Sequence, residues 1–78
     1  MLNEIEKKYD LIRKKMLFYG ELSKETGATE STVMGLWFNS AQGFKIPERH
    51  QQKTIEVLNH CLEYEQAEKR LAEKYFKK

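Results

Sequence analysis

The sequence has few of the residues that interrupt or cross-link a chain: one cysteine, one proline and four glycines among 78 residues. The single Cys61 cannot form an internal disulfide, which favours a reducing compartment. No apolar run approaches the roughly 20 residues that cross a bilayer. The first residues, Met1 to Glu6, are acidic and mixed, unlike a secretory signal. We therefore expect a cytoplasmic protein without a membrane partner.

The residues that catalysis would need are also missing. The four glycines are scattered, so no phosphate-binding loop is present, and no Ser/His/Asp or Cys/His set stands at a catalytic spacing. Glu56 and His60 share one helix face, but a structural zinc site normally takes four ligands and no others follow at metal spacing. The sequence predicts a binding protein rather than an enzyme, with no metal site and no cofactor.

The composition suits one small helical domain over residues 1–78. Hydrophobic residues make up 40% of the chain and charged residues 33%. The net charge of +2 is uneven: +2 in residues 1–18 (five basic, three acidic), −1 in residues 19–46 (two, three) and +1 in residues 47–78 (seven, six). Attraction to nucleic-acid phosphates would have to come from the two flanks.

Apolar spacing predicts a first helix over residues 3–18, ended by Gly20. Its apolar face repeats at intervals of three and four residues and consists of Leu2, Ile5, Tyr9, Ile12 and Met16. Residues 29–39 predict another helix, with Thr29 as its N-cap. Residues 40–46 read as a loop.

Pro47 and Glu48 predict the start of a long last helix, because proline is tolerated in a first helical turn. From about residue 63 to residue 78 this helix extends beyond the core, and its apolar face narrows to a seam typical of helix–helix contacts. The seam consists of Tyr64, Ala67, Leu71 and Tyr75. It could pack antiparallel on Leu2, Ile5 and Tyr9 of the same chain or pair with a second copy, and we favour a homodimer. No strand pattern appears, so the predicted fold class is all-α.

Residues 19–38 form the central motif, two short helices joined by a tight turn. Gly27 can take the positive φ that such a turn requires. The small Ser23 would let the helices approach closely. Apolar residues are spaced to fill the angle between the helices: Leu22, Ala28, Val33 and Leu36.

These residues, with Arg13 and the exit Lys45-Ile46-Pro47, resemble the Cro/repressor-type helix-turn-helix domain of phage and bacterial regulators, over roughly residues 9–62. The resemblance implies a small helix-turn-helix bundle, here with a long C-terminal helix. It also implies a sequence-specific, dimeric double-stranded-DNA-binding protein that acts as a transcriptional regulator or mobile-element accessory factor. Helix 29–39 would enter the major groove.

Carried over position by position, the resemblance divides the candidate DNA-binding residues into two groups. The first would contact base edges: Thr29, Ser31 and Thr32. The second would lie near the phosphate backbone: Lys24, Asn39, Gln42, Lys45, Arg49 and Lys53.

The chain departs from this family in the second helix of the motif. Met34, Gly35, Trp37 and Phe38 make that helix apolar nearly all round, as in a buried helix. Gly35 costs about 1 kcal/mol relative to alanine there, which suggests close packing. The apolar face could be core, a dimer interface or a partner site. The alternative function is therefore a protein–protein adaptor derived from a helix-turn-helix domain, without DNA reading.

Overall fold

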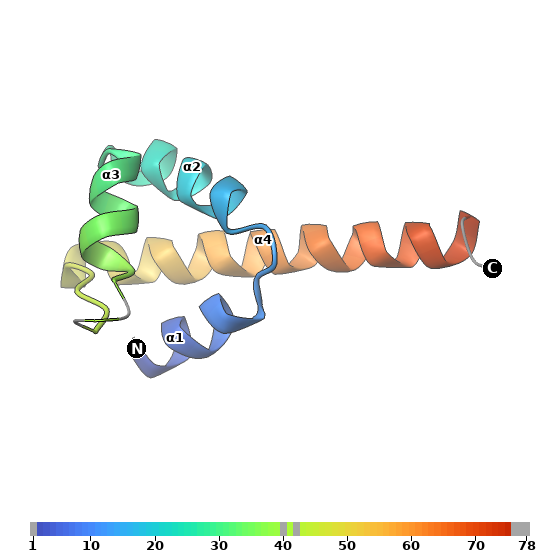
Figure 1. Ribbon diagram of the computed structural model, residues 1–78, viewed down its shortest axis with the longest axis horizontal. Coiled ribbons are helices and arrows are strands. Elements are labelled where there is room, and N and C mark those ends of the chain that lie inside the picture. Colours follow the sequence, from blue (N-terminus) through green and yellow to red (C-terminus); the bar gives the residue numbers. More distant parts are fainter. Residues whose placement is uncertain (1, 40, 42, 76–78) are drawn as a thin grey trace.

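The computed structural model describes residues 2–39, 41 and 43–75. Five helical segments occur in chain order: α1 (Leu2–Leu11), α2 (Lys15–Thr26), α3 (Glu30–Thr32), η1 (Val33–Trp37) and α4 (Glu48–Tyr75). The long α4 is the spine, with α1 and α2 on either side of it and α3 and η1 near its N-terminal end (Figure 1). All regular secondary structure in the described residues is helical, which confirms the all-α class.

The predicted single helix over residues 3–18 is wrong, because the helix is interrupted between α1 and α2. The backbone amides of Arg13 and Lys14 both donate to the carboxylate of Glu65 on α4, at 3.1 Å each. The Lys14 ammonium also donates to Glu68 at 2.7 Å. Glu65 and Glu68 of α4 therefore accept hydrogen bonds from the backbone and side chain of the segment between α1 and α2. This segment contains neither glycine nor proline.

The break changes which side chains face the core. Ile12 and Phe18 are both buried, whereas Met16, assigned to the buried face of the predicted helix, is 63% exposed. Gly20 does not end a helix but lies inside α2, and a Cβ added there would come within 3.2 Å of a Glu30 carboxylate oxygen. Gly20 thus marks the close approach of α2 to the start of α3.

The segment after α3 is a π turn rather than a continuation of the α-helix. The amide of Phe38 donates to the carbonyl of Val33 at 3.0 Å, an i→i+5 bond that places one more residue in the turn. Trp37 and Phe38 are therefore both buried beside Val33. Leu36, predicted to fill the angle between the helices, is instead rotated outward and 58% exposed.

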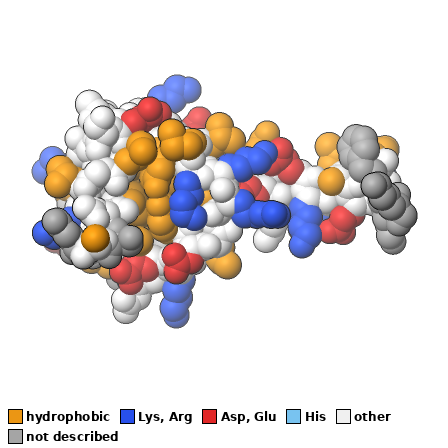
Figure 2. Space-filling model, viewed as in Figure 1, with side chains coloured by type: hydrophobic (Ala, Val, Ile, Leu, Met, Phe, Trp, Pro, Cys, Tyr) orange, Lys and Arg blue, Asp and Glu red, His pale blue; other side chains and the backbone are white. Residues whose placement is uncertain are grey.

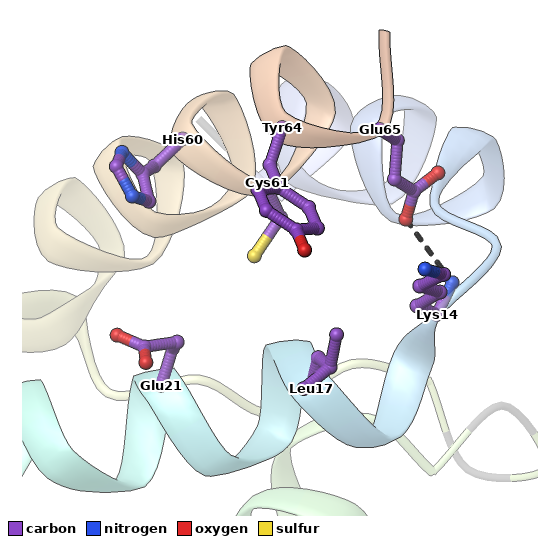
Figure 3. Close-up of a pocket in the computed structure, with 7 residues that line it drawn as sticks. All are labelled: Lys14, Leu17, Glu21, His60, Cys61, Tyr64 and Glu65. Atoms are coloured by element: carbon purple, nitrogen blue, oxygen red, sulfur yellow. Dashed lines mark hydrogen bonds between the residues drawn. The ribbon is translucent and has the colours of Figure 1, made fainter. Parts of the chain in front are cut away.

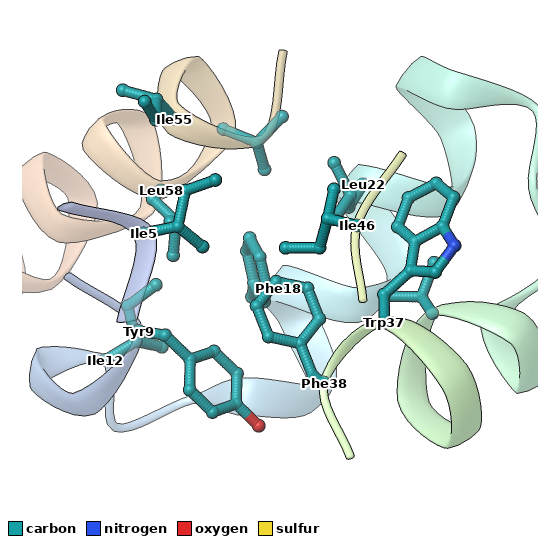
Figure 4. Close-up of a cluster of buried hydrophobic side chains, with 12 residues drawn as sticks. Ile5, Tyr9, Ile12, Phe18, Leu22, Trp37, Phe38, Ile46, Ile55 and Leu58 are labelled. Atoms are coloured by element: carbon teal, nitrogen blue, oxygen red, sulfur yellow. The ribbon is translucent and has the colours of Figure 1, made fainter. Parts of the chain in front are cut away.

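The core is one cluster, with aromatic rings at its centre (Figure 4). The ring of Phe38 stacks on that of Tyr9, with their centroids 4.5 Å apart, and meets the rings of Phe18 and Phe44 edge-on, with centroid distances of 5.2 Å each. The hydroxyls of Tyr9 and Tyr19 are hydrogen-bonded to each other, and burial, then this bond, raises the pKa of Tyr9. Phe38, directly after η1, therefore packs against rings from α1, α2 and the loop before α4.

The last helix begins at Glu48, directly after Pro47, as the sequence predicts. Its buried residues lie in its first half, and every residue from 69 to 75 is exposed. The far end of α4 therefore projects beyond α1 and α2 (Figure 1). The seam does not pack on Leu2, Ile5 and Tyr9, since Tyr64, Leu71 and Tyr75 are each more than half exposed. None of the helices in the described ranges is long and apolar enough to cross a bilayer.

Substituting Gly27 by valine should destabilise the protein. Gly27 has φ +80° at the end of α2, and a β-branched residue is strained in that region. We expect a loss of about 2 kcal/mol and a fall in Tm of roughly 10 °C, measured by circular dichroism. Gly27→Asn is the control, because asparagine tolerates the left-handed conformation; equal Tm values for all three proteins would contradict the assignment of the turn.

Candidate nucleic-acid interface

The turn between α2 and α3 is fixed by its own hydrogen bonds. The amide of Gly27 donates to the carbonyl of Ser23 at 2.9 Å, and the Ser23 hydroxyl donates to the carbonyl of Ala28 at 2.5 Å. The Thr26 hydroxyl donates to the carbonyl of Leu22 at 2.7 Å. Because these bonds join the last turn of α2 to the residue before the Thr29 cap, they set where α3 begins.

Thr29 is the N-cap of α3, as the sequence predicts. Its hydroxyl oxygen accepts from the amide of Thr32 at 3.2 Å, and its hydroxyl also lies 3.0 Å from that of Thr32. A capping hydroxyl satisfies one of the free amides of a first helical turn. Thr29 therefore stabilises the start of α3. Of the predicted base-contacting residues, Thr29 and Ser31 are exposed and Thr32 is half-buried.

One outward face of α3 and η1 remains uncovered. Ser31, Gly35 and Leu36 are exposed and Thr32 is half-buried, and residues four apart lie on one side of a helix. A Cβ added at Gly35 would meet nothing within 4 Å in the described part of the chain. Close packing within the chain, which the sequence suggested, is therefore not the reason for this glycine. The face is uncharged and partly apolar.

Trp37 and Phe38 belong to the core, which is one of the three placements that the sequence left open for them, and they do not form an exposed dimer or partner interface. Each is only 5% exposed. The indole of Trp37 stacks on the imidazole of His50, with ring centroids 5.2 Å apart. The backbone carbonyl of Trp37 accepts from the amide of Lys45 at 3.1 Å. Of the three apolar residues proposed for an interface on this segment, only Met34 is exposed, by 41%.

Asn39 turns back on its own backbone. Its side-chain amide donates to the carbonyl of Gly35 at 3.3 Å, and its side-chain oxygen accepts from the amide of Ala41 at 3.1 Å. These bonds close the end of η1 and use one donor and one acceptor position of the Asn39 side chain. Gln42 lies outside the described residues.

The basic candidates fall into two groups. Lys24, Lys45 and Arg49 are exposed around the helix pair, at the end of α2, in the loop and in the first turn of α4. Lys53 instead lies between two carboxylates, 3.9 Å from Glu25 and 3.3 Å from Glu56. Its charge is therefore largely balanced within the chain, and it is a weaker candidate for phosphate contact.

A cavity of about 290 Å³ lies between α2 and α4, at the base of the projecting helix (Figure 3). Leu17 and Glu21 of α2 face His60, Cys61 and Tyr64 of α4 across it. Burial, reinforced by nearby carboxylates, raises the pKa of the Cys61 thiol. A thiol with a raised pKa is a poor nucleophile, so the residues of this cavity do not suggest covalent chemistry.

The fluorescence of Trp37, the only tryptophan, should report a buried indole. We expect a blue-shifted emission that acrylamide quenches weakly, because the side chain is 5% exposed and covered by His50. His50→Ala should increase quenching, whereas His60→Ala, ten residues further along α4, should not. An emission maximum in buffer equal to that of the urea-unfolded chain would contradict the placement of Trp37.

Comparison with known proteins adds no relative to this picture. No family model, no curated protein and no solved structure matches the chain. What the protein does therefore has to be inferred from its own residues and their geometry.

Proposed function

We propose that this protein is a Cro/repressor-like helix-turn-helix protein that binds double-stranded DNA as a transcriptional regulator or mobile-element accessory factor. Helices α2 and α3 are the two helices of the motif, and the α3–η1 segment enters the major groove. The observation that carries the proposal is the fixed turn at Gly27 followed by an uncovered helix face. That face contains Ser31, Thr32, Gly35 and Leu36.

Exposed cations near the helix pair support the proposal. Lys24 lies in the last turn of α2, Lys45 in the loop before α4 and Arg49 in the first turn of α4, and all three are exposed. Contacts to phosphates supply much of the affinity of DNA-binding proteins and make it depend on salt. In this proposal the three cations orient the protein, and the outward face of α3 and η1 reads the groove.

The second candidate, a protein–protein adaptor, has less support. It depended on an apolar patch of Met34, Trp37 and Phe38, and burial removes two of these three residues from the surface. Met34 and Leu36 are left as exposed apolar side chains. Two side chains are a small anchor for a protein interface, which usually has a cluster of buried aromatic or arginine residues at its centre.

We also propose that the protein is a homodimer through the C-terminal half of α4, with its seam of Tyr64, Ala67, Leu71 and Tyr75. Hydrophobic side chains reach the surface there among charged ones (Figure 2). Residues 63–68 carry three acidic side chains, and residues 69–75 carry three basic and one acidic. The first half stays negative even with Lys14 paired to Glu68. An antiparallel pair of α4 helices therefore sets each acidic half against the partner's basic half, which a parallel pair does not.

Two sets of substitutions should separate base reading from phosphate attraction in mobility-shift assays. Lys45→Ala and Arg49→Ala should each weaken binding to all duplexes and reduce the slope of log affinity against log salt by about one. Replacing Ser31 and Thr32 together by alanine should weaken binding to a duplex selected from a random pool, with little effect on unselected DNA.

Lys7→Ala is the control, since Lys7 is exposed on α1, away from the helix pair, and we expect it to leave the slope unchanged. Absence of salt-sensitive binding to any duplex would overturn the DNA proposal. If Met34→Ala and Leu36→Ala then abolished capture of a protein partner, the adaptor would be the better account.

Sedimentation should detect a dimer that depends on the seam. The wild-type chain should sediment as a dimer at micromolar concentration, and Leu71→Glu as a monomer, because it places a charge in the contact. Leu11→Glu is the matched control, since Leu11 is 66% exposed and Leu71 56%. A monomeric wild-type chain would show that the seam does not join two copies.

A further inference from the structure

The face that the proposed function directs into the groove lacks the side chains that usually read bases. Asn39 and the Thr29 hydroxyl are engaged with the chain's own backbone. Glu30 lies against α2, where its carboxylate approaches Gly20. The Thr32 hydroxyl accepts from the Thr29 hydroxyl at 3.0 Å, and the hydroxyls of Ser31 and Thr32 discriminate bases less sharply than a bidentate arginine or glutamine.

This face instead has an exposed apolar side chain, Leu36, next to a glycine, Gly35. Leu36 is 58% exposed and Gly35, beside it, has open space where a Cβ would be. The backbone of Gly35 does not require glycine, because the glycines with positive φ are Gly27 and Gly43. A helical glycine that neither backbone conformation nor packing in the described residues requires is explained if an external group comes close to the helix there.

The major groove of DNA has one apolar group on its base edges, the C5-methyl group of thymine. We propose, resting on the DNA-binding function proposed above, that Leu36 contacts thymine methyl groups and that Gly35 lets the helix come close enough for this contact. The protein then selects duplexes with thymine at fixed positions, through methyl contact in addition to any hydrogen bonds that Ser31 and Thr32 make to bases. Leu36 is a specificity-determining residue.

Replacing thymine by deoxyuridine tests this directly, since it removes the methyl group and keeps the base pair. The probe is a duplex selected by the wild-type protein from a random pool, and its copy with deoxyuridine at each thymine in turn. Burying one methyl group contributes about 0.8 kcal/mol, so loss of a contacted methyl should weaken wild-type binding about fourfold. Leu36→Ala should bind both duplexes equally, whereas the control Leu11→Ala should keep the discrimination.

Gly35→Ala supplies a second measurement that does not depend on loss of folding. The added Cβ fits the open space, so Tm should rise by roughly 4 °C, while affinity for the thymine duplex should fall. Equal affinity for thymine and deoxyuridine duplexes, or discrimination that survives Leu36→Ala, would overturn this inference and leave the proposed DNA binding intact. Failure to bind any duplex in a salt-sensitive manner would overturn the proposed function itself.

Discussion

The hydrogen bond from the Phe38 amide to the Val33 carbonyl is the contact on which the rest of the structure depends. By placing an additional residue in that turn, it brings the indole of Trp37 and the ring of Phe38 into the core together. Phe38 then contacts rings from α1, α2 and the loop, and Trp37 covers the start of α4 through His50. The same turn rotates Leu36 to the surface, so one backbone bond determines both the centre of the core and the character of the exposed face.

Features that follow from local chemistry could be predicted from the sequence. Thr29 caps α3, Gly27 takes positive φ and α4 starts directly after Pro47, because each depends on residues within one turn. The end of α1 could not be predicted in this way, since the group that takes the amides of Arg13 and Lys14 comes from Glu65, about fifty residues later. A sign of the interruption was present in the sequence: Phe18 comes six positions after Ile12, a spacing that does not place two side chains on one helical face.

For the candidate site, the sequence could predict which segment follows the turn but only some of the contacts that its side chains make. Position alone identifies the segment after the turn and the exposed Ser31, Lys24, Lys45 and Arg49. It could not show that Asn39 bonds to its own backbone or that Lys53 lies between two carboxylates, because both depend on how side chains meet after folding. The exposure of Leu36 was missed for a related reason. The π turn changes the number of residues per turn, whereas an argument from hydrophobic spacing assumes that this number is constant.

Because α4 is one uninterrupted helix, its length also determines the direction in which the side chains at its far end point. Each residue added to an α-helix advances it by about 1.5 Å and turns it by roughly 100°. A single residue inserted after Ala67 would leave the globular part unchanged but turn Leu71 and Tyr75 away from Tyr64, whereas seven residues would restore the face and lengthen the rod by about 10 Å. In the proposed dimer, the length of the projecting helix would therefore set the spacing of the two globular parts, and insertions of about two turns would change this spacing while keeping the seam on one face.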